Sequence, residues 1–325
     1  MKLARRQFMH LAAGVTALSA VSRLAWAQSY PSRPVRIFVG HPPGGVTDIV
    51  ARLIASWLSE RLGQQFVVEN RPGANSNIAA GEVVRAPPDG HTLFLLSATN
   101  AYNVTLYDNL NFSLSRDMAP VASIGRDAFV MVVNPSFPAQ TVPEFIAYAK
   151  ANPGKLNLAT SGAGSSSDLY GALFKAMAGA DLVTVPYRGV GPASPDLMSG
   201  RVDVMFDPLV SAIGFIRAGK MRALGVTTTT RRDVLPDVPS IAESVPGYEG
   251  DDWTGISTTA NTPPEVIGIL NREVNAALAD PAFKARLTEL GVEPFAGSPA
   301  AFGKFIGEYT EKWGKVIRAA NIKPE

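Results

Sequence analysis

Two short glycine-containing stretches have the residue types needed to bind an anion. The first, residues 40–48, reads Gly-His-Pro-Pro-Gly-Gly-Val-Thr-Asp and lies between an expected strand and an expected helix. Gly44 and Gly45 would let the backbone approach a ligand closely, and Thr47 is a candidate N-cap. Because the free amides at a helix start carry partial positive charge, this loop is a candidate anion site.

A second stretch of the same design, residues 160–167, reads Thr-Ser-Gly-Ala-Gly-Ser-Ser-Ser and adds hydroxyl donors. Neither stretch continues into the Gly-Lys-Ser/Thr of a phosphate-binding loop, and the second lacks the third glycine of a dinucleotide fingerprint. One such loop is compatible with a purely structural turn. Two of them favour a clamp for an anion, and a carboxylate fits better than a phosphate.

Further candidates stand where expected strands end. Ser97, Thr99 and Asn100 follow one strand, Tyr187 follows another, and Asp207 ends a third. Alternatives stay open, since a first-turn acid such as Asp48 also stabilises its own helix, and Tyr187 could equally pack at a hinge. The predicted ligand-binding set is His41, Pro43, Gly44, Gly45, Thr47, Asp48, Ser97, Thr99, Asn100, Ser161, Gly162, Gly164, Ser165, Ser166, Tyr187 and Asp207.

Short apolar runs alternate with helical patterns along most of the chain, which predicts an α/β fold with parallel sheets. Such sheets bind ligands at the carboxyl ends of their strands. The expected strands are 35–40, 66–69, 92–97, 121–124, 129–134, 156–160, 182–186, 202–206 and 221–227. The expected helices are 47–62, 77–85, one from 143, 166–177, one ending near 218, 264–278, 281–290 and 299–320.

Groups suited to catalysis or metal binding are scarce. Beyond residue 27 the only histidines are His41 and His91, and the chain has no cysteine. No Gly-x-Ser-x-Gly elbow occurs, and no two histidines have metal-ligand spacing. We therefore predict a protein that is not an enzyme, with no catalytic residue, no metal and no cofactor. His41, beside the first loop, is expected to line a cleft.

The N-terminus predicts export. Basic Lys2, Arg5 and Arg6 precede an apolar run, and Ala25-Trp26-Ala27 supplies a signal-peptidase pattern. Residues 1–27 are therefore the predicted signal peptide, cleaved after Ala27, with the protein in the periplasm. The pair of arginines favours the twin-arginine route, and an ordinary secretion signal stays open.

Cleavage would remove four basic and no acidic residues, leaving 26 lysines and arginines against 28 acids. A mature net charge of −2 gives no reason to expect nucleic-acid or membrane binding. The absence of cysteine suits an oxidising compartment. About 300 residues are enough for two lobes, each with its own core.

Nearly everything after residue 28 resembles the Bug family of extracytoplasmic solute receptors, the binding components of tripartite tricarboxylate transporters. The order and spacing of seven short segments carry the resemblance. They are 30–36 (Tyr-Pro-Ser-Arg-Pro-Val-Arg), the Pro-Gly-Gly-x-Thr-Asp loop ending at Asp48, 68–74 (Val-Glu-Asn-Arg-Pro-Gly-Ala), 185–189 (Val-Pro-Tyr-Arg-Gly), 203–207 (Asp-Val-Met-Phe-Asp), 235–239 (Leu-Pro-Asp-Val-Pro) and 312–317 (Lys-Trp-Gly-Lys-Val-Ile).

This resemblance implies a Venus-flytrap fold in which the chain crosses twice between lobes, lobe one being 28–124 plus 226–325 and lobe two 125–225. It also implies that backbone amides, hydroxyls and bridging waters of the two loops hold a ligand carboxylate. Three positions depart from the family pattern. Asp168 stands where relatives often carry histidine, Val46 replaces a proline, and Asn75-Ser76 interrupts a glycine-rich run. Whether Asp168 faces the cleft or solvent is left open.

The expected partners are a small organic acid or amino acid and the permease subunits of a transporter, with the receptor a monomer. Two alternatives remain. The liganded receptor could signal to a membrane sensor kinase, or the protein could be a periplasmic enzyme that acts on a carboxylate with carboxylates, lysines or tyrosines as its acid–base groups.

Overall fold

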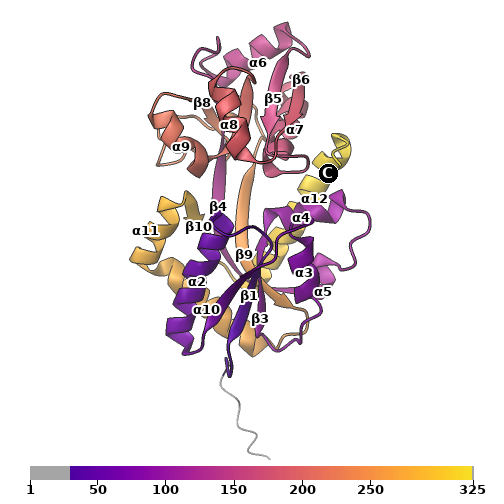
Figure 1. Cartoon of the computed structure of the whole chain (residues 1–325), viewed down its shortest axis with the longest axis vertical. Coiled ribbons are helices and arrows are strands. Elements are labelled where there is room, and N and C mark those ends of the chain that lie inside the picture. The colour runs from indigo at the N-terminus through magenta and orange to yellow at the C-terminus, as the bar shows by residue number, and fades with distance from the viewer. Residues whose placement is uncertain (1–29, 324–325) are drawn as a thin grey trace, which may run out of the picture.

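The computed structural model describes residues 30–323. Figure 1 shows two lobes stacked along the long axis, with β4 (Met118–Val133) and β9 (Asp251–Thr259) running between them. No helix in the described range is long and apolar enough to cross a membrane. The predicted signal peptide and its cleavage site lie outside the described residues.

Lobe one is built on a sheet in the order β2-β1-β3-β9-β4. β1 pairs in parallel with β2 and β3, whereas β9 is antiparallel to β3 and β4. The sheet strands besides β4 and β9 are β1 (Val35–Val39), β2 (Phe66–Asn70), β3 (Thr92–Ser97) and β10 (Val292–Pro294). The helices are α2 (Val46–Leu62), α3 (Asn77–Val83), α4 (Ala98–Leu106), α5 (Leu114–Asp117), α10 (Pro264–Ala279), α11 (Pro281–Glu289) and α12 (Pro299–Ala319).

Lobe two continues from the far half of β4, which pairs with β7 on one side and β8 on the other. Parallel pairing then extends the sheet from β7 through β5 to β6. The strands are β5 (Leu156–Thr160), β6 (Leu182–Pro186), β7 (Val204–Pro208) and β8 (Arg222–Val226). The helices are α6 (Val142–Ala151), α7 (Ser166–Ala178), α8 (Val190–Met198), α9 (Leu209–Arg217) and the short 3₁₀ turn Ile241–Glu243.

The long strand β4 corrects the expectation of two separate strands at 121–124 and 129–134. Residues 118–128 pair with β9 in lobe one, and residues 129–133 pair with β7 in lobe two. Gly125, Arg126 and Asp127 looked like a break, yet all three are paired with β9 and β10. The expectation of parallel sheets holds for the outer strands of each lobe, whereas the crossing strands are antiparallel.

The predicted boundaries between the lobes are positions 125 and 226. Position 125 lies inside β4, a few residues before its partner changes from β9 to β7. After β8 the chain stays against lobe two, because Tyr248 is fully buried and packs on Phe174 and Phe206. The assignment of residues to lobes stays a prediction.

An aromatic cluster with side chains from α4, α7 and α12 joins the two lobes. Trp313 of α12 is fully buried, and its ring lies 5.1 Å from Tyr170 of α7 and 5.6 Å from Tyr102 of α4. Tyr309, one turn earlier on α12, packs on both Trp313 and Trp253. Because α7 belongs to lobe two and α4 to lobe one, the last helix of the chain fills the core between the lobes.

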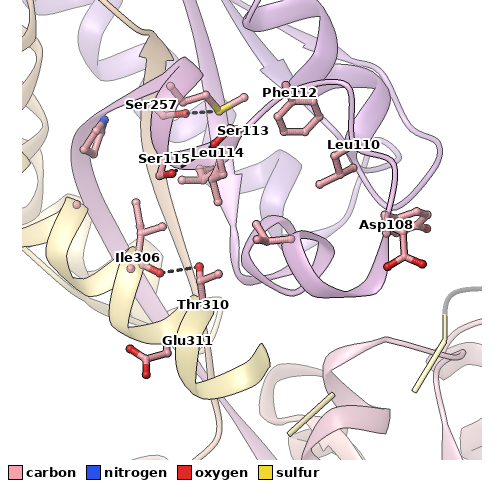
Figure 2. Close-up of a pocket in the computed structure, with 17 residues that line it drawn as sticks. Asp108, Leu110, Phe112, Ser113, Leu114, Ser115, Ser257, Ile306, Thr310 and Glu311 are labelled. Atoms are coloured by element: carbon pink, nitrogen blue, oxygen red, sulfur yellow. Dashed lines mark hydrogen bonds between the residues drawn. The ribbon is translucent and has the colours of Figure 1, made fainter. Parts of the chain in front are cut away.

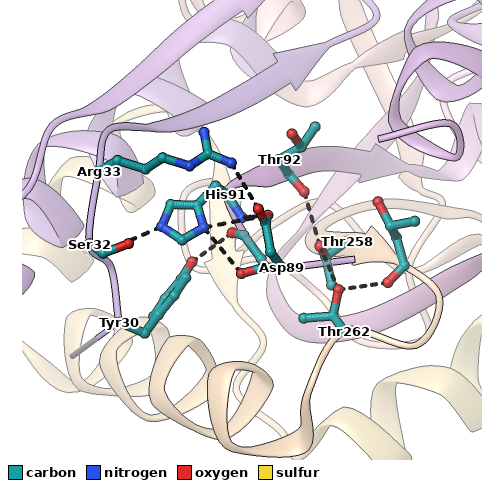
Figure 3. A network of polar contacts seen from close by, with 10 residues as sticks. Tyr30, Ser32, Arg33, Asp89, His91, Thr92, Thr258 and Thr262 are labelled. Atoms are coloured by element: carbon teal, nitrogen blue, oxygen red, sulfur yellow. Dashed lines mark hydrogen bonds and ion pairs between the residues drawn. The ribbon is translucent and has the colours of Figure 1, made fainter. Parts of the chain in front are cut away.

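The segment before β1 is tied down at the end of the sheet where β1 and β3 begin (Figure 3). The Tyr30 hydroxyl donates to the carbonyl of Gly90 at 2.7 Å, and the Ser32 amide donates to His91 Nε2 at 3.3 Å. Because Nε2 accepts, the ring hydrogen lies on Nδ1, which is 3.2 Å from the carbonyl of Asp89. His91 is therefore a structural residue.

Candidate functional site

Loop one, residues 40–45, joins β1 to α2 with a backbone that only glycine adopts freely. Gly44 has a φ of +87°, and Gly45 is the N-cap of α2 with no side-chain cap. The prediction that Thr47 is the N-cap is wrong, because helical geometry begins at Val46. Without a capping side chain, the first-turn amides of this 17-residue helix are available to an anion.

The Asp48 carboxylate stabilises the conformation of loop one through hydrogen bonds. Its Oδ2 accepts from the Gly44 amide at 2.9 Å and from Arg52 Nε at 3.0 Å, and its Oδ1 accepts from Asn70 at 2.9 Å. Burial pushes the pKa of Asp48 upward, but the hydrogen bonds from Arg52, Gly44 and Asn70 outweigh it and leave the pKa below its usual value. The same Asn70 amide donates to the carbonyl of His41 at 3.0 Å.

Loop two, residues 161–165, repeats this brace between β5 and α7. Gly164 has a φ of +71°, and its amide donates to Asp168 Oδ2 at 3.0 Å, as Gly44 does to Asp48. Ser165 is the N-cap, and its hydroxyl accepts from the Asp168 amide and donates to the Gly162 carbonyl. Asp168, 8% exposed, therefore faces neither the cleft nor solvent but its own loop.

These two aspartates should differ in their effect on stability. We expect Asp48→Asn to lower the free energy of unfolding at pH 7 by about 1–3 kcal/mol, because an ionised, hydrogen-bonded acceptor is lost. Since its folded pKa is depressed, this contribution exists above pH ~4 and disappears as the pH falls through the folded pKa. Urea unfolding at pH 7 and pH 3 measures both effects.

Asp168→Asn is the matched control, because burial raises the pKa of Asp168 despite the Gly164 amide and Lys175. An acid whose pKa is raised by folding makes the folded protein less stable as the pH rises above the pKa of that acid in the unfolded chain. The asparagine variant should therefore be no less stable than the parent at pH 7. Equal losses in both variants would show that the two braces do not differ in ionisation.

A cavity of about 470 Å³ lies between the two loops. Six predicted site residues line it, namely His41, Thr99, Ser161, Gly164, Ser165 and Ser166. The residues that line it without having been predicted are Gly40, Pro42, Pro72, Gly73, Asn75, Ser76, Phe129, Pro208 and Asp252. The predicted residues that do not line it are Pro43, Gly44, Gly45, Thr47, Asp48, Ser97, Asn100, Gly162, Tyr187 and Asp207.

The carboxyl end of β3 turns directly into α4, a helix that was not predicted. Ser97 is its N-cap, and the Ser97 amide donates to Asn100 Oδ1 at 3.0 Å. Ser97 and Asn100 therefore form a capping box, in which each side chain bonds to the backbone amide of the other residue. Thr99, which lies between them, lines the cavity.

Tyr187 and Asp207 do not line the cavity. The Tyr187 hydroxyl donates to Asp196 of α8 at 2.9 Å, which fixes the ring against that helix. Asp207 is fully buried, and neither of its carboxylate oxygens has a hydrogen-bond partner. Burial raises the pKa of Asp207 to about 7. Its neighbour Pro208 is the residue of this strand end that lines the cavity.

Asp252 is the charged residue that sequence reasoning missed. It lines the cavity, and its Oδ1 accepts from Tyr170 at 2.6 Å and from Tyr102 at 3.1 Å. Its Oδ2 accepts from the Ser166 hydroxyl at 2.8 Å. Since Ser166 and Tyr170 belong to lobe two, whereas Tyr102 belongs to lobe one, Asp252 is a junction of both lobes at the cavity wall.

Residues 74–76 line or border the cavity in a strained conformation. Ala74, Asn75 and Ser76 have φ values of +45°, +48° and +73°, a region that non-glycine residues rarely enter. The Ser76 side chain packs so close to Gly40 that a Cβ on Gly40 would stand 1.7 Å from Ser76 Oγ. Glycine is therefore required at the end of β1.

The family can now be decided. A family model described as the tripartite tricarboxylate transporter family receptor, TctC, matches residues 50–322. The chain belongs to this family. BugT of Bordetella pertussis is 33% identical over 91% of this chain and 92% of BugT. The predicted Bug-type receptor family is confirmed.

Solved structures confirm the predicted two-lobed fold of this TctC receptor. It is 37% identical to Rpa4515 of R. palustris, solved with adipate, with a TM-score of 0.80 over 91% of this chain and 100% of the other. It is 33% identical to MatC of Rhodopseudomonas palustris, solved with malate, with a TM-score of 0.75 over 89% of this chain and 100% of the other.

A larger hollow of about 660 Å³ lies elsewhere on lobe one of this TctC receptor (Figure 2). Apolar side chains of the α4–α5 segment, such as Phe112 and Leu114, face Ile306 of α12 across it. It lies away from both loops, so the smaller cavity is the candidate ligand site.

Three tryptophans pack in the interior rather than at the cavity. Trp253 is fully buried, and its ring packs on Phe302, Phe305 and Tyr309 at 5.5–5.7 Å. Trp313 is buried in the aromatic cluster, and Trp57 is half-buried against Phe283.

Proposed function

We propose that this TctC receptor captures a small carboxylate-bearing ligand in the cavity between loops one and two and delivers it to the permease of a tripartite transporter in the periplasm. One observation carries the proposal. Two loops, each followed by a helix of more than ten residues and each braced by the same aspartate-to-glycine contact, line one cavity. Loop two brings the start of α7 to the cavity wall through Ser165 and Ser166, and a helix start of this kind favours an anion, whereas loop one contributes Gly40, His41 and Pro42.

The relatives support a carboxylate as that anion, because Rpa4515 was solved with adipate and MatC with malate. In this chain Ser161 and Ser165 of loop two line the cavity. Binding is reversible, and closure of the lobes follows from tighter binding in the closed form. The permease then binds the closed, liganded receptor.

The first test is thermal unfolding of the mature protein with a panel of small carboxylates, each paired with its neutral amide. Ligand at 100 times its Kd should add about 2.7 kcal/mol to the free energy of unfolding. For a chain of this size that stabilisation raises Tm by a few degrees. We expect acids to produce this shift and their amides to produce none.

The same panel shows what would contradict the proposal. A shift produced by amides or amines and by no acid would exclude the anion clamp. Chemical conversion of a stabilising acid during overnight incubation, followed by NMR, would instead support the enzyme alternative. An unchanged acid that raises Tm is the expected result.

A further inference from the structure

The two loops of the cavity differ in the acidic side chains that lie beside them. At loop one the Asp48 carboxylate is paired with Arg52 at 3.0 Å, so it adds little uncompensated negative charge at the start of α2. At loop two, Asp252 lines the cavity, and Asp168, buried beneath the loop, forms no salt bridge within the described chain. Loop one lines the cavity through Gly40, His41 and Pro42, whereas loop two lines it together with the start of α7, and the acid that faces the ligand space, Asp252, lies beside Ser166 on the loop-two side.

Asp252 has hydrogen-bonding capacity left for a ligand. An ionised carboxylate offers about four acceptor positions, and Tyr102, Tyr170 and Ser166 use three of them. Two of these donors go to Oδ1, whereas Oδ2 receives Ser166 alone. The remaining position is therefore on Oδ2, beside Ser166.

Ser166 is oriented as an acceptor by the same contact. Its single hydroxyl hydrogen is directed to Asp252 at 2.8 Å, so its oxygen can accept a hydrogen bond from a ligand but cannot donate one. The loop-two end of the cavity thus presents oxygen acceptors. Ser76, whose buried hydroxyl has no partner, packs against Gly40 on the loop-one side and can donate or accept.

No positive side chain offsets these acceptors. Within the described chain, the residues that line the cavity include neither lysine nor arginine. Burial lowers the pKa of His41, the one histidine that lines it, so the imidazole brings no charge at neutral pH. Asp127, directly opposite Asp252 in the β4–β9 ladder, does not line the cavity, and burial raises the pKa of its carboxyl well above the usual value.

We propose that Asp252 and Ser166 form the subsite for the far end of the ligand, and that this subsite selects a carboxylate bearing an ammonium or hydroxyl group over a dicarboxylate. The inference rests on the proposed function, because it takes the ligand carboxylate to be bound at loop one. An ammonium or hydroxyl donates to the free Oδ2 position and to Ser166. Burial raises the pKa of Asp252, while hydrogen bonds from Tyr170, Ser166 and Tyr102 favour its ionised form, and that form would meet a second carboxylate as a like charge.

The test uses sets of ligands with equal chain length. One set is adipate, 6-aminohexanoate, 6-hydroxyhexanoate, hexanoate and hexylamine, and a shorter set is built on succinate and 4-aminobutanoate. Binding to the mature protein is measured by titration calorimetry at pH 7.5. We expect the amino or hydroxy acid to bind at least about tenfold more tightly than the diacid of its length, as a like-charge contact demands.

The outcomes separate the two proposals. If acids bind but diacids bind as tightly as their amino and hydroxy counterparts, the subsite is wrong and the carboxylate receptor stands. If hexylamine binds and no acid does, the receptor function itself is wrong. If no member of either set binds, a carboxylate of this size is excluded, and both proposals fail for such ligands.

Variants then assign the preference to residues. Asp252→Asn keeps an acceptor for the tyrosines while removing the charge, and it should abolish the preference by raising the affinity for the diacid. Asp181→Asn makes the same change at an exposed acid of lobe two and should leave the preference unchanged. If Asp252→Asn does not fold, Ser166→Ala should weaken the hydroxy acid more than the diacid, and equal weakening would overturn the assignment.

Discussion

Trp313→Ala is expected to lower the free energy of unfolding by about 3–5 kcal/mol, the range for removing a large aromatic side chain from a core. The ring is fully buried and contacts tyrosines of α4 and α7 as well as Tyr309 on its own helix. Because these neighbours come from both lobes, the structure cannot collapse around the space without moving one lobe against the other. Urea unfolding at pH 7 measures the loss.

Trp57→Ala is the matched control for that loss. Trp57 is half-buried on α2, and its aromatic contact is Phe283 of α11 within the same lobe. Partial exposure leaves less apolar area to lose, so we expect a decrease of about 1–2 kcal/mol. If the two variants lose the same stability, the interlobe core has no special weight, and the packing argument for α12 is wrong.

Asp207→Asn is expected to stabilise the protein above pH 7 and to change it little at pH 4. Burial raises the pKa of Asp207 to about 7, against an unfolded value near 3.9. Between these values the folded state holds one proton more than the unfolded state, so stability falls as the pH rises through this window. A shift of about three units corresponds to as much as about 4 kcal/mol at pH 8.

The measurement is Tm as a function of pH from 4 to 8 for the parent and the variant. Asp181→Asn, at an exposed position, is the control and should follow the parent at every pH. A variant that is less stable than the parent at pH 8 would mean that the ionised Asp207 has a stabilising partner. The assignment of a buried, unpartnered carboxyl would then be wrong.

Helix boundaries were predictable where local chemistry determines them. The helices α10, α11 and α12 each have proline at N1, and the observed spans agree with the predicted ones to within a residue. Gly63 ends α2 in the left-handed conformation, as its position after Leu62 indicated. Proline and glycine act within one turn, so distant contacts do not override them.

The crossing strands were not predictable in the same way. β9 has the sequence Asp-Asp-Trp-Thr-Gly-Ile-Ser-Thr-Thr, and its last two hydroxyls bond to residues far away in the sequence. Thr258 donates to the carbonyl of Thr92, and Thr259 donates to that of Val83. Because β9 does not look like a strand, its Asp252 could not be placed at the cavity. Likewise, α8 contains Pro192 and Pro195, which argued against a helix.

The loops were predictable as glycine-containing turns between a strand and a helix, but not in their internal contacts. An aspartate stands four residues after a glycine in both, at Gly44 and Asp48 and again at Gly164 and Asp168. That shared spacing was a usable indication of the brace. From the sequence, Asp168 was expected to face either the cleft or solvent. The structure instead turns its side chain back onto the Gly164 amide of its own loop.

The order of strands in lobe one has a consequence for the growing polypeptide. β3 is paired with β1 on one side and with β9 on the other, yet all of lobe two is synthesised between β3 and β9. Until β9 emerges, β3 is an unfinished edge that can pair with another chain. A product truncated before Asp251 therefore keeps that edge and lacks α12 as well, which makes premature termination an aggregation hazard, more than a mere loss of binding.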